Sequence, residues 1–253
     1  MSLQSKANPA AEAEHRVEIV PTAKRVRVMF GGETVADSTG VLIIRETRHM
    51  PVYYFPPEDV RRDLLSPTDH HTHCPYKGDA SYWTVRAGGH EAENAVWSYP
   101  EPLSDVAGLS GYLAFYWDRM DAWYEEDEQV FVHPRDPFVR IDVLESRRRV
   151  RVVLGGETVA DTTHALFLFE TGHRPRYYIP TEDVRTDLLH LSSKRTGCPY
   201  KGFARYWSVS AGGRVFEDVV WSYPDPSREV ARIKERLCFY EERVDSVLVA
   251  RSE

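Results

Sequence analysis

The chain has 253 residues, of which 42% are hydrophobic and 28% charged, so its composition is that of a globular protein of one or two domains. Its formal net charge of −7 at pH 7 argues against non-specific nucleic-acid binding, because that binding requires a cationic surface. No apolar run approaches the roughly 20 residues of a membrane span, and the N-terminus lacks an apolar signal core, so we expect a cytoplasmic protein with no nucleic-acid or membrane partner.

Residues 1–15 are polar and rich in alanine, and we expect them to be disordered. From residue 16 onward the sequence repeats itself. When residue n is aligned with residue n + 124, 52 of the 96 positions from Pro21 to Tyr116 are identical, without a gap. Agreement over this length indicates duplication of a whole domain. We therefore predict a first repeat at 16–126, a linker at 127–137 and a second repeat at 138–250.

Each repeat is predicted to be mainly β, with about eight short strands. In the first repeat, alternating or β-branched apolar runs place strands at 17–19, 26–30, 35–37, 41–44, 52–55, 82–85, 96–99 and 115–116. Gly31 and Gly32, between two of these runs, predict a tight hairpin. Because tight turns rather than helical crossovers join the strands, we expect strongly twisted antiparallel sheets.

Two short helices are expected in each repeat. Pro57, followed by two acidic residues, suits the first position of a helix, and Thr181 in the second repeat offers an N-cap hydroxyl. Val60 and Leu64 are spaced to face the core. The second helix is clearest after Ser227, a candidate cap. Three apolar residues that follow share one helical face: Val230, Ile233 and Leu237.

Polar segments are predicted to connect these elements. Residues 66–74 are expected to form a loop that includes three histidines, which the second repeat lacks, so we do not predict a metal site there. The acidic run at 125–128 and the prolines at 133–137 are typical of an exposed linker.

The three cysteines do not form a disulfide framework. Cys74 and Cys198 are equivalent in the two repeats, whereas Cys238 aligns with Ala114. An odd number of cysteines with no close pairs suits a reducing compartment.

Several motifs occur in both repeats in the same order. They are Gly-Gly-Glu-Thr-Val-Ala-Asp, Cys-Pro-Tyr-Lys-Gly and Trp-Ser-Tyr-Pro-x-Pro. The series resembles the family called domain of unknown function 427, sometimes labelled nucleotidyltransferase-like, and the chain is identified as a tandem member. The resemblance implies two tandem β-tent-like domains. The chain has no glycine-serine phosphate loop, no Asp-x-Asp pair and no Cys-x-x-Cys pair of the kind that β-tent relatives use for zinc, so we predict no cofactor and no metal.

The pentapeptide at 74–78 and 198–202 supplies the candidate site residues. Lys77 and Lys201 are candidates for holding an anionic ligand; alternatively, each lysine stem lies on the tyrosine ring with its ammonium in water. Cys74 and Cys198 are candidate reactive thiols beside these lysines, or small buried residues that fix the loop.

Aromatic residues kept in both repeats are predicted to line a ligand pocket. The expected ligand-binding set, with the two lysines, is Tyr76, Tyr82, Trp97, Tyr200, Tyr206 and Trp221. Of two consecutive strand residues such as Tyr53 and Tyr54, one is expected to face inward and the other outward.

Glu46 with His49, and Glu170 with His173, form candidate acid–base pairs, or simply solvated loop pairs. The leading hypothesis is that the protein binds a small polar or anionic molecule near the pentapeptide loops. The alternatives are an enzyme that uses the loop lysine and cysteine, and a non-catalytic scaffold for protein interactions. A monomer is expected, because the duplication already supplies a pair of domains.

Overall fold

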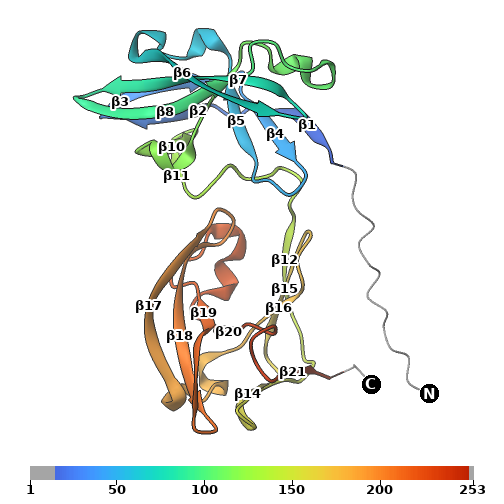
Figure 1. Ribbon diagram of the computed structural model, residues 1–253. Helices are drawn as coiled ribbons and strands as arrows, with labels where there is room; N and C mark the ends of the chain where they lie inside the picture. Colours follow the sequence, from blue (N-terminus) through green and yellow to red (C-terminus); the bar gives the residue numbers. More distant parts are fainter. Residues whose placement is uncertain (1–14, 251–253) are drawn as a thin grey trace. The chain divides into compact units, whose positions relative to one another are not determined.

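The computed structural model describes residues 15–250 (Figure 1), so the segment expected to be disordered lies, apart from His15, outside the described residues. The chain divides into two compact units, residues 1–136 and 137–253. Both are built almost entirely from antiparallel strands, and the mainly β fold class expected from the sequence is confirmed.

The first unit contains two antiparallel sheets. The larger has seven strands in the order β1 (Val17–Pro21), β4 (Leu42–Glu46), β5 (Val52–Phe55), β9 (Leu113–Phe115), β8 (His90–Ser98), β7 (Gly78–Ala87) and β6 (Leu65–Cys74). The smaller has the order β11 (Glu128–Val130), β10 (Ala122–Glu125), β2 (Val26–Phe30) and β3 (Glu33–Ser38). The pairing of β5 with β9 brings residues about 60 positions apart to the centre of the large sheet.

The second unit repeats this arrangement in three sheets. Their orders are β12 (Ile141–Glu145), β15 (Leu166–Glu170), β16 (Arg176–Tyr178); β14 (Glu157–Thr162), β13 (Val150–Leu154), β21 (Ser246–Val249); and β17 (Leu189–Cys198), β18 (Gly202–Ala211), β19 (Arg214–Ser222), β20 (Cys238–Phe239). A single bridge between Ile179 and Leu237 joins the first and third of these, where β5 and β9 pair in the first unit.

The helical segments are short 3-10 turns. They are η1 (Pro57–Asp59), η2 (Arg62–Leu64), η3 (Ser104–Leu109) and η4 (Trp117–Arg119), then η5 (Thr181–Asp183), η6 (Thr186–Leu188) and η7 (Arg228–Ile233). Neither of the two predicted caps makes a capping hydrogen bond, and only Ser227 stands at an N-cap position. Thr181 is the first residue of η5 rather than its cap, and its hydroxyl donates to the Glu235 carbonyl at 2.9 Å. Ser227 stands at the N-cap of η7, but its hydroxyl donates to the Tyr200 carbonyl at 2.5 Å.

The segment expected to be a loop at 66–74 is strand β6, at the edge of the large sheet. It pairs with β7 through the backbone, with a register shift between Pro67 and His71. Most of its side chains are exposed, because an edge strand needs only one ladder of hydrogen bonds and no apolar face. The absence of apolar alternation therefore hid this strand in the sequence.

The acidic run at 125–128 belongs to a β hairpin rather than to a connector, although Glu126, Asp127 and Glu128 are exposed as expected. It forms the turn between β10 and β11, in which Glu125 pairs with Glu128 across the hairpin. Glu125 is buried, accepts a hydrogen bond from the Tyr53 hydroxyl at 2.6 Å, and forms an ion pair with Lys24. A buried carboxylate with two such partners is a fixed part of the first unit.

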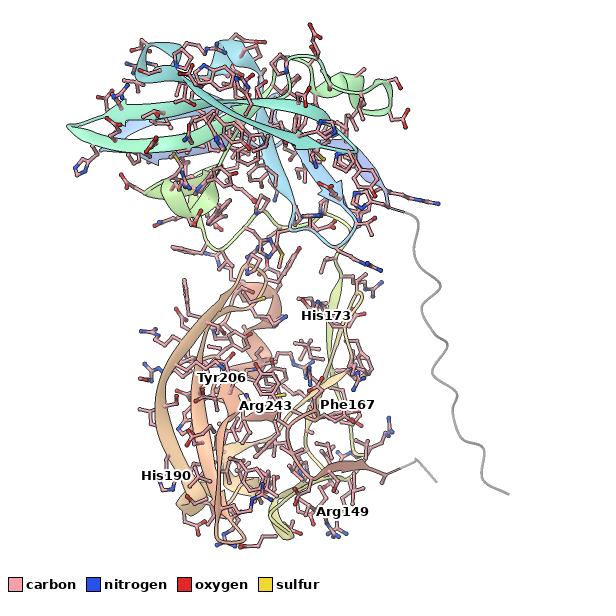
Figure 2. All side chains as sticks on the ribbon, in the orientation of Figure 1. Arg149, Phe167, His173, His190, Tyr206 and Arg243 are labelled. Atoms are coloured by element: carbon pink, nitrogen blue, oxygen red, sulfur yellow. The ribbon has the colours of Figure 1, made fainter. Side chains whose placement is uncertain are left out.

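The large sheet of the first unit carries a core cluster on each face. Tyr53 packs in the cluster with Phe55 and Trp123, whereas Tyr54 packs on the other side with Tyr82 and Leu109. The two side chains point to opposite faces, as the two-residue period of a strand requires, but the expectation that one of them faces outward is wrong, because both faces of this sheet are covered and both tyrosines are buried. The second unit also has two core clusters, to which Phe167 on β15 and Tyr206 on β18, both labelled in Figure 2, respectively belong.

Two hairpin turns of the first unit meet through glycines, one joining β2 to β3 and the other β7 to β8. A Cβ built on Gly31 would lie 2.1 Å from the Ala87 carbonyl oxygen, and one on Gly88 would lie 1.9 Å from the Gly31 carbonyl oxygen. Both have positive φ, 59° and 54°. The hairpin predicted from Gly31 and Gly32 is confirmed, and its glycines also allow two backbones to touch.

Candidate functional site

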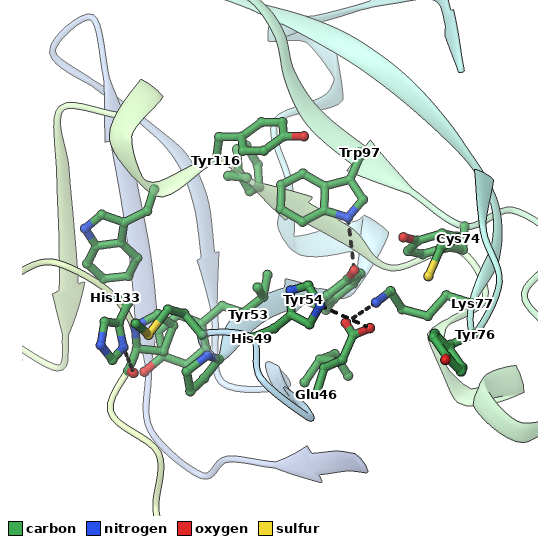
Figure 3. A pocket seen from close by; sticks show the side chains of 18 of the residues that line it. Glu46, His49, Tyr53, Tyr54, Cys74, Tyr76, Lys77, Trp97, Tyr116 and His133 are labelled. Atoms are coloured by element: carbon green, nitrogen blue, oxygen red, sulfur yellow. Dashed lines mark hydrogen bonds and ion pairs between the residues drawn. The ribbon is translucent and has the colours of Figure 1, made fainter. Parts of the chain in front are cut away.

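The first unit contains a cavity of about 660 Å³, lined by residues from both sheets and the segments that connect them (Figure 3). One end holds charged and polar groups from β4 and the pentapeptide; aromatic rings from β5, β8 and the segment after β9 form the walls. All five candidates of the first repeat line it: Cys74, Tyr76, Lys77, Tyr82 and Trp97.

The pentapeptide is a tight turn that holds Lys77 in a fixed direction. The Lys77 amide donates to the Cys74 carbonyl at 3.2 Å, and the Lys77 carbonyl accepts from the Leu103 amide at 3.1 Å. Gly78 has a φ of 100°, and a Cβ there would lie 3.2 Å from the Glu101 carbonyl oxygen. Glycine is therefore required at this position, which accounts for its place in the motif.

The Lys77 side chain is buried, with 9% of it exposed, and its ammonium forms an ion pair with Glu46, of which 11% is exposed. Figure 3 shows the two groups pointing toward each other. The ammonium also lies 6.0 Å from the centre of the Tyr99 ring. The alternative in which this ammonium lies in water is therefore wrong.

At the polar end of the cavity, the Glu46 carboxylate contacts two histidines in addition to Lys77. Its Oε1 lies 3.0 Å from Nε2 of His15 and 3.9 Å from Nε2 of His49. Burial disfavours the charged carboxylate, but the hydrogen bond and charge of Lys77, with contributions from the two histidines, hold the pKa of Glu46 below its usual value. The acid–base pair proposed for Glu46 and His49 is thus part of a larger group in which Lys77 is the closer partner.

This lowered pKa predicts a pH dependence. A carboxyl that is more acidic when folded contributes its full stabilisation above its ordinary pKa of 4.5 and loses it as the pH falls through the lowered value. We expect the free energy of unfolding of the first unit to fall more steeply below about pH 5 in the wild type than in Glu46→Gln. Urea titrations at a series of pH values would measure this difference; equal slopes would contradict it.

The aromatic wall is fixed by hydrogen bonds and ring contacts. The Trp97 indole N–H donates to the Tyr54 hydroxyl at 3.0 Å, and the Trp97 and Tyr116 rings lie 4.6 Å apart at 44° (Figure 3). Burial raises the pKa of Tyr54 well above its usual value, so this hydroxyl stays protonated. Tyr76, on the pentapeptide, stacks on His15 at 3.5 Å.

Cys74 is partly buried between the pentapeptide and the core, and it is a free thiol. Burial raises the pKa of the neighbouring Tyr99, and the proximity of Cys74 adds to this shift. Both side chains line the cavity. Cys74 therefore packs against the core and also lines the cavity, and its reactivity stays a prediction.

The second unit reproduces the polar end and the ring pair. Lys201 forms an ion pair with Glu170 at 2.5 Å, and both side chains are buried. The Trp221 indole donates to the Tyr178 hydroxyl at 3.3 Å, as Trp97 does to Tyr54. Cys198 is partly buried like Cys74. Tyr206 bonds to Thr196 at 2.8 Å, the same distance as between Tyr82 and Thr72.

The two units differ at the first residue of β5 in the first unit and of β16 in the second. Arg176, the first residue of β16, lies over the Trp221 and Tyr240 rings and pairs with Glu242. The equivalent residue of the first unit is Val52, which lines the cavity. The sequence predictions missed this position because they considered residues kept in both repeats. The alignment of the two repeats did contain a signal for this position, because Val52 is replaced by Arg176 while the residues on either side are identical.

Tyr116, Asp118 and His15 also line the cavity and were not predicted. Among residues 15–250, no group of three or more His, Cys, Asp or Glu side chains is arranged to hold a metal ion. In the same part of the chain, no helix has the length and apolar character needed to cross a membrane.

Comparison with known proteins gives a family. No curated protein matches the chain. The model of a domain of unknown function, DUF427, matches residues 18–126 and again 142–250. These two matches cover most of the chain and coincide with the duplicated β units described above. The chain therefore belongs to the DUF427 family and carries two tandem copies of its domain.

Proposed function

We propose that the first unit binds a small polar molecule in the cavity beside the pentapeptide. The observation that carries this proposal is the cavity itself, about 660 Å³, on which the pentapeptide and the aromatic residues of five strands converge. This volume is in the range of small-molecule sites, and the mixture of aromatic walls with a few fixed polar groups is typical of them.

At the polar end of the cavity, the Lys77–Glu46 pair favours a ligand group that is polar and uncharged over one that is anionic. Lys77 is already neutralised by Glu46, so it does not present an unbalanced positive charge. The pair instead offers donors on the ammonium and acceptor positions on the carboxylate, next to the imidazoles of His15 and His49. A ligand group with both a donor and an acceptor would satisfy this end.

Binding without chemistry is the function that the geometry supports best. A nucleophilic lysine needs a neutral, accessible amine, whereas the Lys77 ammonium is engaged by a carboxylate. A reactive cysteine needs a base or a cation beside its sulfur, and burial raises the pKa of the neighbouring Tyr99 hydroxyl, which therefore stays protonated and cannot act as that base.

The substitution Val52→Arg tests the proposal, because it adds the side chain that the second unit carries at the same place. In a thermal-shift screen against a small-molecule library, we expect compounds that stabilise the wild type to lose their effect on Val52→Arg. Val52→Ile, which keeps the site apolar, should respond like the wild type. Compounds that stabilise all three equally bind elsewhere, and a screen in which every stabilising compound behaves so would contradict the proposal.

A further inference from the structure

The second unit holds a cation of its own against its ring pair, Trp221 and Tyr240. The centre of the Arg176 guanidinium lies 5.6 Å from the Trp221 ring centre and 5.9 Å from that of Tyr240. Its two terminal nitrogens donate to both carboxylate oxygens of Glu242, at 2.9 and 2.8 Å. A guanidinium over aromatic faces with a bidentate carboxylate is a favourable arrangement for a cation.

The first unit has the same ring pair, Trp97 and Tyr116, without this guanidinium. Its rings lie 4.6 Å apart at 44°, and those of the second unit 4.4 Å apart at 43°. The geometry of the pair is therefore independent of the cation. Val52 replaces Arg176, so the space over the rings opens into the cavity that Val52, Trp97 and Tyr116 line.

The counter-charge is also kept. Asp118 stands at the position of Glu242, lines the cavity, and is close enough for its charge to act on Tyr116. Among the residues that the structure describes, it makes no ion pair. A carboxylate and two aromatic rings are thus left together in the first unit, where the second unit adds a guanidinium.

A second arginine does not account for this difference, because both units have it. Arg119 lies 5.0 Å from the Tyr116 ring centre, and Arg243 lies 5.6 Å from that of Tyr240. Each is held by backbone carbonyls of the neighbouring strand. Since Arg243 coexists with Arg176, Arg119 leaves room for a cation in the first unit.

From this comparison we infer that the ligand of the first unit carries an organic cation, a guanidinium or substituted ammonium, bound over Trp97 and Tyr116 with Asp118 as its counter-ion. The inference rests on the proposed function and adds the chemical class of the ligand. The body of the ligand would extend from this cation toward the Lys77–Glu46 pair at the polar end of the cavity.

Butylguanidinium and butylurea test the inference, because they have nearly the same shape and differ in charge. In isothermal titration calorimetry at low salt, we expect the wild type to bind one butylguanidinium per chain at least about tenfold more tightly than butylurea. Asp118→Asn should reduce this preference several-fold. Because Asp118 is exposed, this variant is expected to fold, which circular dichroism would check.

The second unit supplies the reciprocal variant. Arg176→Val removes the internal cation and should raise the stoichiometry of butylguanidinium binding from one to two per chain. Val52→Arg should abolish binding to the first unit, and a chain with both substitutions should bind one equivalent again.

The outcomes separate the two proposals. Equal affinity for butylguanidinium and butylurea, or no binding of butylguanidinium to the wild type, overturns the inference about the cation. If the cation inference fails but library compounds still lose their stabilising effect on Val52→Arg, the proposed binding site remains supported and only the charge assigned to the ligand is wrong. If Val52→Arg changes the response to no compound at all, the site itself is wrong.

Discussion

Replacing Lys77 by methionine is expected to lower the free energy of unfolding of the first unit by about 3 kcal/mol. Methionine fills a similar volume but leaves the Glu46 carboxylate, 11% exposed, without the cation that stabilises it. Removing one partner of a buried ion pair is costly because the remaining charge is desolvated and uncompensated. His15 remains 3.0 Å from Glu46 and still provides a polar partner for the carboxylate.

Two further variants show whether the loss comes from the unpaired charge. The double substitution Lys77→Met with Glu46→Leu should recover most of the stability, since no charge is then buried alone. Lys201→Met should destabilise the second unit to a similar extent, because the Lys201–Glu170 pair is buried to about the same degree as the Lys77–Glu46 pair. Amide hydrogen exchange would assign each effect to its unit. A Lys77→Met protein as stable as the wild type would show that the pair contributes nothing.

Gly88→Ala is expected to destabilise the first unit by about 3 kcal/mol, through the sum of backbone strain and overpacking. The added methyl would lie 1.9 Å from the Gly31 carbonyl oxygen, so one of the two hairpin turns must move. Because a backbone oxygen in a tight turn cannot rotate away, the cost exceeds that of a side-chain clash.

Gly89→Ala is the matched control. Gly89 has a φ of 79°, also positive, but nothing lies within 4 Å of the position where its Cβ would be. Its substitution should therefore cost only the conformational strain, about 1 kcal/mol. Chemical denaturation of the two variants would isolate the contact between the turns. If both variants lost the same free energy of unfolding, the two turns would not be in close contact in solution.

The β class and the duplication could be predicted because they depend on local patterns. Alternation with period two identified the buried strands, and glycine pairs identified the tight turns. Strand β6 could not be found in this way, because its side chains are polar and exposed and only its backbone pairs. The strand β11 was missed for a similar reason, since its burial pattern contains no buried residue.

The location of the candidate site could be predicted from the sequence, but the contacts between its residues could not. Lys77 and Glu46 were both recognised as shared between the repeats, yet they are 31 positions apart in the sequence, and three other strands separate β4 from β7 in the large sheet, so no local pattern links the two residues. The comparison of the two repeats also favoured identical positions. The position at which the two units differ beside their ring pairs, Arg176 against Val52, is by definition outside that set.

The Arg176 side chain has a consequence for how the two units respond to a ligand. A cation attached to the chain has a fixed effective concentration, so the occupancy of its site does not change with the surroundings. Under the proposed binding, the equivalent position of the first unit is filled according to the concentration of free ligand, and the stability of this unit rises by mass action as that concentration increases. The proposal therefore implies that the stability of one half of the chain depends on the concentration of a solute, whereas that of the other half does not.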